Sequence, residues 1–178
     1  MHVLIVYESM YGNTRAVAEA IGAGIKGSGA SVTVAHAARV TAVQTAAADL
    51  IVLGGPTHAW SMTRPSTRRG AVDAAHKSAG HARRLDQDAD VTGLREWIAE
   101  VSGHSAVKPF AAFDTRRRAP LGLSGSAARA VDRKLRRLGW PRMHRPVGFY
   151  VTKSDELEPD ELARARAWGA DLAATAGP

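Results

Sequence analysis

Hydrophobic positions follow two alternating patterns along the chain. Residues 3–7 form a short apolar run without polar alternation, which is typical of a strand covered on both faces. After a polar loop, Val17, Ile21 and Ile25 recur at the spacing of one face of a helix. The chain is therefore predicted to begin with a buried strand, a loop and an amphipathic helix that starts at Thr14.

The same alternation continues to the end of the chain. Further strands are predicted at residues 31–35, 49–53, 109–113 and 147–151. The last helix is predicted to start at Pro159. Alternating strands and helices favour a parallel sheet with helices on both faces, so we expect one α/β domain over residues 1–178. The predicted inner faces of the later helices are Leu94, Trp97, Ile98 and Val101; Val131, Leu135 and Leu138; and Leu162, Ala165, Gly169 and Leu172.

Residues 61–92 interrupt this alternation. The segment is polar, basic and broken by Pro65, Gly70 and Gly80, and its pattern allows at most a short helix near residues 71–78. Loops of this length inside a domain are usually functional or mobile. We therefore expect a long basic loop or short-helix excursion here.

The net charge of +7 is concentrated in the middle of the chain, where residues 61–146 hold eighteen Lys and Arg against eight Asp and Glu. No helix-turn-helix, zinc-finger or RNA-binding sheet motif accompanies these cations, so nucleic-acid binding is disfavoured. A solvated basic face, or one that steers acidic partners, is the preferred interpretation.

Cysteine and hydrophobicity narrow the chemistry further. The chain has no cysteine, so any redox chemistry would belong to a bound cofactor. The histidines and carboxylates show no metal-ligand spacing, and no metal site is predicted. No apolar stretch approaches the roughly 20 residues of a membrane span, and no signal-peptide pattern is found, so we expect a cytoplasmic protein without a membrane span.

Residues 9–14 join the first predicted strand to the first predicted helix. A helix N-terminus carries a partial positive charge and unpaired N–H groups, so the loop before it is suited to bind a phosphate. Ser9, Asn13 and Thr14 add side-chain donors. Gly12 permits a positive φ and the close approach of a ligand. The loop matches neither the Walker nor the Gly-x-Gly-x-x-Gly pattern. Alone, it predicts either a monophosphate site built of neutral donors or an ordinary turn.

Three strand ends carry motifs in a recognisable order. The first strand ends in Tyr-Glu-Ser-Met-Tyr-Gly-Asn-Thr-Arg, the third in Gly-Gly-Pro-Thr-His-Ala-Trp and the fourth in Phe-Asp-Thr-Arg. With these motifs the chain resembles the flavodoxin-like FMN-binding proteins. The resemblance implies a three-layer α/β/α sandwich around a five-stranded parallel sheet of order 2-1-3-4-5. It also implies FMN at the carboxyl ends of strands 1 and 3, where the strand order reverses.

The resemblance also implies three groups of FMN contacts. Among the histidines, only His58 is a candidate catalytic residue, and a weak one. No other catalytic residue is predicted. The implied contacts are Ser9, Met10, Tyr11, Gly12, Asn13 and Thr14 at the phosphate, Pro56, Thr57, His58, Ala59 and Trp60 beside the flavin ring, and Asp114, Thr115 and Arg116 at its other edge.

Arginines distinguish this chain from the acidic flavodoxins. Residues 116–118 are three consecutive arginines, and Arg64, Arg68 and Arg69 lie in the excursion. If these cations lie near the ring, they should stabilise anionic reduced flavin and raise its potential.

Three functions remain open from the sequence. The first is an FMN-binding redox protein that passes electrons to a partner protein with an acidic surface. The second is an FMN-dependent NAD(P)H:quinone or protoporphyrinogen-type oxidoreductase whose substrate pocket is formed by residues 61–92. The third is a non-catalytic binding module that uses its basic surface. The sequence does not separate an enzyme from a carrier or predict an oligomeric state.

Overall fold

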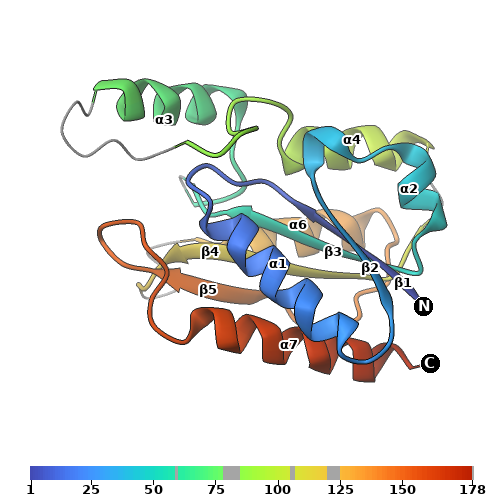
Figure 1. Cartoon of the computed structure of the whole chain (residues 1–178). Coiled ribbons are helices and arrows are strands. Elements are labelled where there is room, and N and C mark those ends of the chain that lie inside the picture. The colour runs from blue at the N-terminus through green and yellow to red at the C-terminus, as the bar shows by residue number, and fades with distance from the viewer. Residues whose placement is uncertain (59, 78–84, 105–106, 120–124, 178) are drawn as a thin grey trace.

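Five parallel strands form one sheet in the order β2-β1-β3-β4-β5 (Figure 1). The computed structural model describes residues 1–58, 60–77, 85–104, 107–119 and 125–177. This sheet, with helices on both faces, confirms the predicted fold class and strand order. The strands are β1 His2–Tyr7, β2 Ser31–His36, β3 Leu50–Pro56, β4 Phe110–Arg117 and β5 Val147–Val151.

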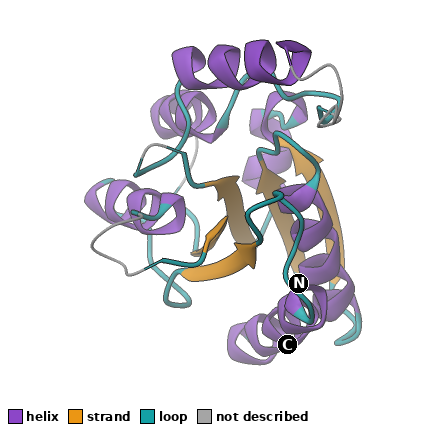
Figure 2. Ribbon diagram, turned by 90° about the vertical axis from the view of Figure 1, so that its left-hand side faces the viewer, coloured by secondary structure: helices purple, strands orange, loops and turns teal. Residues whose placement is uncertain are grey.

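Helices cover both faces of the sheet, as the end-on view in Figure 2 shows. Helices α1 and α7 pack together on one face, while α4 and α6 cover the other. The helices are α1 Asn13–Lys26, α2 Ala42–Ala47, α3 Pro65–Lys77, α4 Leu94–His104, α6 Ala127–Arg137 and α7 Glu161–Ala176, with a short 3-10 turn at Ala37–Arg39.

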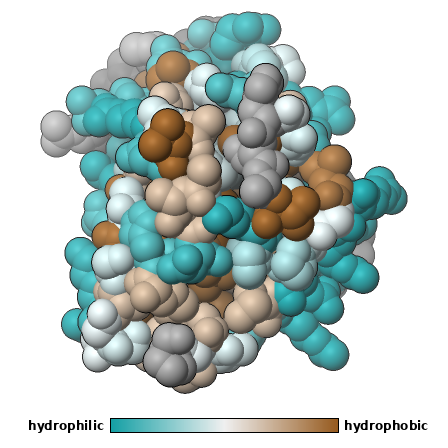
Figure 3. All heavy atoms as spheres, turned by 90° about the vertical axis from the view of Figure 1, so that its right-hand side faces the viewer, coloured by the Kyte–Doolittle hydropathy of each residue, from teal (hydrophilic) through white to brown (hydrophobic). Residues whose placement is uncertain are grey.

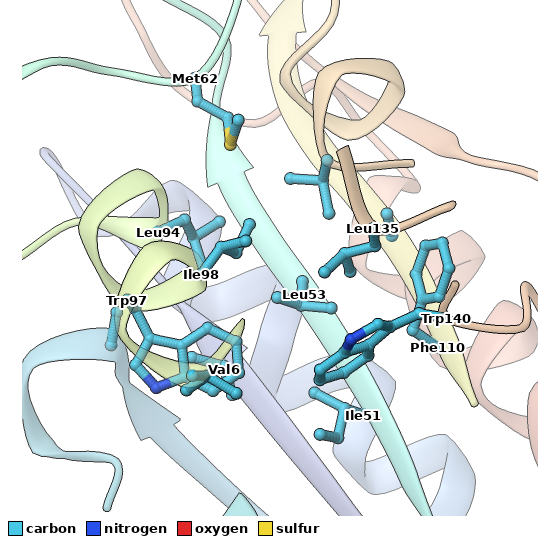
Figure 4. Packing of buried hydrophobic residues seen from close by; sticks show 14 of the residues in the cluster. Val6, Ile51, Leu53, Met62, Leu94, Trp97, Ile98, Phe110, Leu135 and Trp140 are labelled. Atoms are coloured by element: carbon cyan, nitrogen blue, oxygen red, sulfur yellow. The ribbon is translucent and has the colours of Figure 1, made fainter. Parts of the chain in front are cut away.

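The two faces have separate hydrophobic cores. In Figure 4, Leu94 and Ile98 of α4 and Leu135 of α6 meet around Leu53 of β3. On the other face, α1 and α7 approach so closely that a Cβ atom on Gly24 would lie 2.0 Å from the Arg166 carbonyl oxygen. Only glycine fits such a backbone contact, so this position fixes the α1–α7 packing.

The strand register brings the functional loops to one edge. Tyr7 pairs with Gly54 across β1 and β3, and Pro56 pairs with Thr115 across β3 and β4. The loops that follow these strands therefore emerge side by side. The opposite edge, where the strands begin, carries both chain termini (Figure 1). In Figure 3, hydrophobic residues on that side stand in separate groups among hydrophilic ones.

Two helices between the strands differ from what the sequence pattern predicted. Helix α3 is longer than the predicted helix at residues 71–78, and it begins at Pro65, a residue suited to a first turn. Its buried face is small, with Arg68 and Ala71 on it, so the apolar periodicity is weak. Helix α2 was not predicted. It is six residues long and begins with a capping box between Thr41 and Gln44.

Two residues predicted to face inward are exposed. Leu138 is 41% exposed because α6 ends at Arg137, and Gly139 follows with φ 84° as predicted for the helix terminus. Leu162 is 46% exposed, and the carboxylate of Glu161 is buried in its place.

The start of α7 explains the second difference. Asp160 has a φ of 64°, so the helix begins at Glu161 rather than at Pro159. Glu161 then accepts a hydrogen bond from the Tyr150 N–H at 2.9 Å and pairs with Arg164.

Candidate functional site

A cleft of about 410 Å³ opens at the carboxyl ends of β1, β3, β4 and β5. It lies where the strand order reverses between β1 and β3, the usual ligand position in open parallel sheets. Its lining combines hydroxyl, amide and guanidinium groups with apolar side chains. The lining residues are Met10, Tyr11, Asn13, Thr14, Pro56, Thr57, His58, Thr115, Arg116, Arg117, Val151 and Asp155.

The 9–14 loop folds back on itself before α1 begins. The buried Ser9 Oγ accepts a hydrogen bond from the Gly12 N–H at 3.1 Å. Gly12 has a φ of 87°, and α1 starts at the next residue. The first N–H groups of a helix have no hydrogen-bond partner within the helix. In α1 the first of these groups belongs to Asn13, which lines the cleft. Ser9 and Gly12 thus shape the loop and do not line the cleft.

Two side chains of the loop hold it to neighbouring strand ends. Asn13 Nδ2 donates to the Asp155 carbonyl at 2.6 Å. The hydroxyls of Thr14 and Thr115 lie 2.7 Å apart, and either could donate to the other. Whichever donates, the accepting hydroxyl keeps its own hydrogen, so the pair can still donate one hydrogen bond to a ligand.

Asp114 lies beneath the cleft rather than in it. Its carboxylate is fully buried and accepts from the hydroxyls of Thr57, at 3.1 Å, and Ser126. It also accepts from the Ala128 N–H at 3.1 Å and pairs with Arg116 Nη1 at 2.6 Å. Asp114 therefore fixes the ends of β3 and β4 and the start of α6 in one arrangement.

Of the residues predicted in the loop after β3, some line the cleft and others do not. Pro56, Thr57 and His58 line the cleft, and His58 is exposed there. Trp60 is 59% exposed with a φ of 74° and does not line the cleft. Ala59 lies outside the described residues. The proposed contact of Trp60 with a flavin ring stays a prediction.

The arginines at the cleft carry compensated charges. Arg116 pairs with Asp114, and Arg117 pairs with Asp155 at 3.1 Å. Arg118 pairs with Glu158 at 2.7 Å and does not line the cleft. The charges of these three arginines are therefore balanced by carboxylates.

Arg117, Val151 and Asp155 line the cleft but were missing from the residues predicted from the sequence. Val151 ends β5 and Asp155 lies in the next loop. The signal available was topological, because the carboxyl ends of all parallel strands meet at one edge. The resemblance supplied no motif after β5.

A buried ionic cluster, also missed from the sequence, lies beside the loop. Arg68 of α3 is 4% exposed and Glu8, at the end of β1, is 2% exposed. Arg68 Nη2 lies 3.0 Å from Glu96 Oε2, while Nη1 lies 3.8 Å from Glu8 Oε1 and donates to Thr63 Oγ1 at 3.1 Å. Thr63 in turn donates to Glu8. Arg68 therefore lies among carboxylates and does not line the cleft.

The same cluster supports α4. Glu8 Oε2 accepts from the Leu94 N–H at 2.9 Å, and Glu96 accepts from the Gly93 N–H at 2.9 Å. A Cβ on Gly93 would lie 2.4 Å from Arg68 Nη1, so the glycine leaves room for the guanidinium. The residue directly before the 9–14 loop is thus held to α3 and α4 together.

The 61–92 segment packs against the outer side of the loop. Met10 forms a small buried cluster with Ala71 and Ala89, and its carbonyl accepts from the Asp86 N–H at 2.8 Å. No described residue of 61–92 lines the cleft. The described part of the segment therefore supports the loop and adds no lining to this cleft.

No group of three or more potential metal ligands, and no helix able to span a membrane, occurs in the described part of the chain.

Residues 4–67 match the family model of a flavodoxin domain. Among solved structures, a flavodoxin from the domain Archaea is 23% identical, with 99% of both chains covered and a TM-score of 0.69. A Megasphaera elsdenii flavodoxin is 19% identical, with 97% of this chain and 98% of that chain covered and a TM-score of 0.64.

A flavodiiron core from Synechocystis is 18% identical with a TM-score of 0.66. The match covers 99% of this chain and 36% of that chain. No curated protein matched the sequence. The resemblance to flavodoxins is thus confirmed by the family model over residues 4–67, and the fold is flavodoxin-like along the whole chain.

Proposed function

From the flavodoxin-domain match of residues 4–67 and the flavodoxin-like fold, we propose that this chain binds FMN without a covalent bond and transfers electrons through it. The observation that carries the proposal is the cleft at the β1–β3 switch point. Its lining combines the phosphate-suited loop with apolar and hydroxyl groups from three further strand ends. Its volume of about 410 Å³ falls in the range of small-ligand sites.

The 9–14 loop fits a phosphate monoester. Its donors are the neutral N–H groups at the start of α1 and the Thr14–Thr115 hydroxyl pair. Around a Cβ built on Gly12, the nearest side chain is Arg15 at 3.8 Å, so the glycine borders open space. A group that carries two negative charges gains from the helix dipole there.

The remaining lining residues fit a flat, partly polar ring. Pro56 and Val151 offer apolar contact, and Thr57 and His58 offer polar groups on the β3 side. When bound, FMN would supply one- or two-electron chemistry. The protein's part is to bind, orient and exclude water, and Arg116 and Asp114 hold the β4 side of the cleft in shape.

The test is the visible absorption spectrum of the purified protein, before and after incubation with FMN and gel filtration. We expect a flavin spectrum with about one FMN per chain. A colourless protein that retains no FMN after incubation would falsify the proposal and favour a non-catalytic binding module.

An electron carrier is favoured over an NAD(P)H-dependent oxidoreductase, because no described residue of 61–92 covers the cleft. Stopped-flow mixing of the FMN-loaded protein with NADPH or NADH separates the two. We expect slow flavin bleaching without a partner reductase. Bleaching within seconds would assign the protein to the oxidoreductases instead.

A further inference from the structure

Helix α6 presents a continuous row of cations. Every exposed position on the helix from Arg129 onward is basic, and the row extends about 12 Å along the helix axis at the usual rise per residue. None of these cations has a carboxylate partner among the described residues. The row consists of Arg129, Arg133, Lys134, Arg136 and Arg137.

Elsewhere in the described chain many arginines are paired. Arg15 pairs with Asp86, and Arg39 pairs with Asp88. The one acid of α6, Asp132, is itself buried and lies 3.5 Å from Arg142. Helix α6 thus carries five basic residues and no exposed acidic one.

A hollow of about 400 Å³ lies beside this row, between α6 and the residues before α3. Its floor includes the buried Met62 and Ala130, and Leu138 is exposed at its end. Its cationic lining residues are Arg95 of α4 and Arg133, Lys134 and Arg137 of α6. An apolar hollow with a charged border is the arrangement of a protein–protein contact centre and its rim.

The hollow and the cleft are neighbours. They are linked by two backbone hydrogen bonds, in which the His58 N–H donates to the Ser61 carbonyl at 3.0 Å and the Ser61 N–H donates to the His58 carbonyl at 3.1 Å. His58 lines the cleft, whereas Ser61 lines the hollow. Helix α6 also begins at the cleft, because the Ala127 N–H donates to Thr57 Oγ1 at 2.9 Å.

We propose that the α6 row and its hollow form the docking surface for an acidic redox partner protein. An apolar side chain of the partner occupies the hollow, and its carboxylates face Arg133, Lys134 and Arg137. The proposal rests on the proposed function, since it puts the partner beside the cleft that would hold FMN. A second copy of the chain is disfavoured, because the two rows would repel each other.

An acidic protein fits better than nucleic acid. Binding of a nucleic-acid backbone is dominated by its charge and needs no apolar pocket, whereas this surface combines cations with the apolar Met62, Ala130 and Leu138. A charged row beside the cleft would also steer an acidic partner toward it at low ionic strength.

The test uses two forms of one probe. Cytochrome c has a basic surface, and succinylation of its lysines replaces ammonium groups with carboxylates, so the two forms differ in charge sign on one scaffold. Binding to the purified protein, before and after incubation with FMN, is measured by surface plasmon resonance. In parallel, the protein is reduced anaerobically by dithionite, and each ferric haem that takes one electron from it becomes ferrous.

Two triple variants of equal net charge separate the surface from the total charge. R133Q/K134Q/R137Q removes three cations of the row. K26Q/R145Q/R166Q removes three exposed cations located on α1, before β5 and on α7. Glutamine keeps a helix propensity close to that of lysine and arginine.

We expect the wild type to bind and reduce the succinylated form in preference to the native form. The α6 triple should weaken binding by about tenfold, since three exposed charge pairs are lost, and the control triple should change it less than about twofold. Equal losses in both triples would overturn the proposal, as would binding of a short DNA duplex that is tighter than that of the succinylated probe at about 150 mM ionic strength.

The binding arm separates this proposal from the proposed function. If the protein binds the succinylated probe through α6 but retains no FMN, the docking surface is supported and the redox role is contradicted. If the protein retains FMN and reduces both probe forms equally, the redox role is supported and the docking surface is contradicted.

Discussion

Arginine has opposite environments in helices α3 and α6. Arg68 of α3 is 4% exposed and lies among Glu8, Thr63 and Glu96. The arginines of α6 are exposed and have no carboxylate partner in the described part of the chain. The same residue type therefore holds the structure together in one helix and leaves charge available at the surface in the other.

The difference follows from burial. A guanidinium taken out of water must be matched by carboxylates and hydrogen bonds, and the match then fixes the elements that supply them. For Arg68 these elements are β1, α3 and α4, and β1 leads directly into the 9–14 loop. An exposed arginine loses little by lacking a partner, so it remains free to meet one from another molecule.

The largest effect is expected from Arg68→Met. The change leaves the buried Glu8 carboxylate without a cation, so the free energy of unfolding should fall by about 3–5 kcal/mol. Urea denaturation, with the m-value held unchanged, measures it. Arg69→Met is the matched control, since Arg69 is the exposed neighbour on the same helix, and it should cost less than about 0.5 kcal/mol. Equal midpoints for the two variants would show that the cluster does not hold α3.

A weaker variant keeps this prediction testable if Arg68→Met does not fold. Arg68→Lys retains the charge but loses the two-pronged geometry that reaches Thr63 and Glu96 together. It should lose about 1–3 kcal/mol. A stability equal to that of the wild type would contradict the role of the guanidinium fork.

The next effect concerns the loop that the cluster supports. Thr14→Val removes one hydroxyl of the Thr14–Thr115 pair and should weaken FMN binding about tenfold, the typical loss for one hydrogen bond. Flavin fluorescence titration measures the affinity. Thr175→Val, an exposed threonine on α7, should leave it unchanged. If both variants bind FMN like the wild type, the hydroxyl pair has no part in the site.

His36 sharpens the comparison with Arg68, because it can give up its charge on burial. Burial lowers its pKa from the ordinary value of 6.5, and the nearby carboxylates of Asp88 and Asp86 only partly oppose this shift. The ring nitrogen Nδ1 accepts a hydrogen bond from the Ala38 N–H at 3.2 Å. The neutral ring is therefore the form that the folded protein favours.

The sign of the pH dependence follows. As the pH falls below about 6.5, the unfolded chain binds a proton at His36 before the folded chain does, so the free energy of unfolding falls by at most about 1.4 kcal/mol per pH unit until the folded pKa is passed. Urea denaturation between pH 7 and pH 5 measures it. His36→Asn should flatten this part of the curve, and an unchanged slope would exclude His36 as its source.

The smallest effect is expected from the α6 triple R133Q/K134Q/R137Q. These side chains are exposed or half-buried and unpaired in the described chain, so the free energy of unfolding should change by less than about 0.5 kcal/mol. Thermal unfolding of the FMN-loaded protein checks it. A loss comparable to that of Arg68→Lys would mean that the row has a structural role and would weaken the contrast between the two helices.

The fold was predictable because its signals are local. Most strands of the sheet contain an apolar run, and α1, α4 and most of α6 show helical periodicity. The errors fall where the pattern is weak. Helix α3 buries a charged arginine, which no hydrophobic pattern reveals. Helix α7 begins with a buried glutamate, Glu161, whereas the pattern predicted that the next residue, Leu162, would be the buried one.

The candidate site was predictable only in part. The predicted loops at residues 9–14 and 56–58 both supply cleft-lining residues, because their motifs are contiguous in the sequence, and their FMN contacts stay a prediction. Asp155 and the Glu8–Arg68 cluster depend on contacts between distant segments, and a single sequence does not contain these. The motif residue Asp114 was predicted at the ring, yet it is buried beneath the cleft, since a motif identifies a loop without the direction of each side chain.

The most direct test of the account compares FMN with riboflavin, which lacks the phosphate, in titrations of the apoprotein followed by flavin fluorescence. If the 9–14 loop and the start of α1 hold the phosphate, FMN should bind with one site per chain and about 100-fold more tightly than riboflavin, the difference expected for two or three hydrogen bonds to a charged group. Equal affinities for the two flavins, or no binding of either, would contradict it.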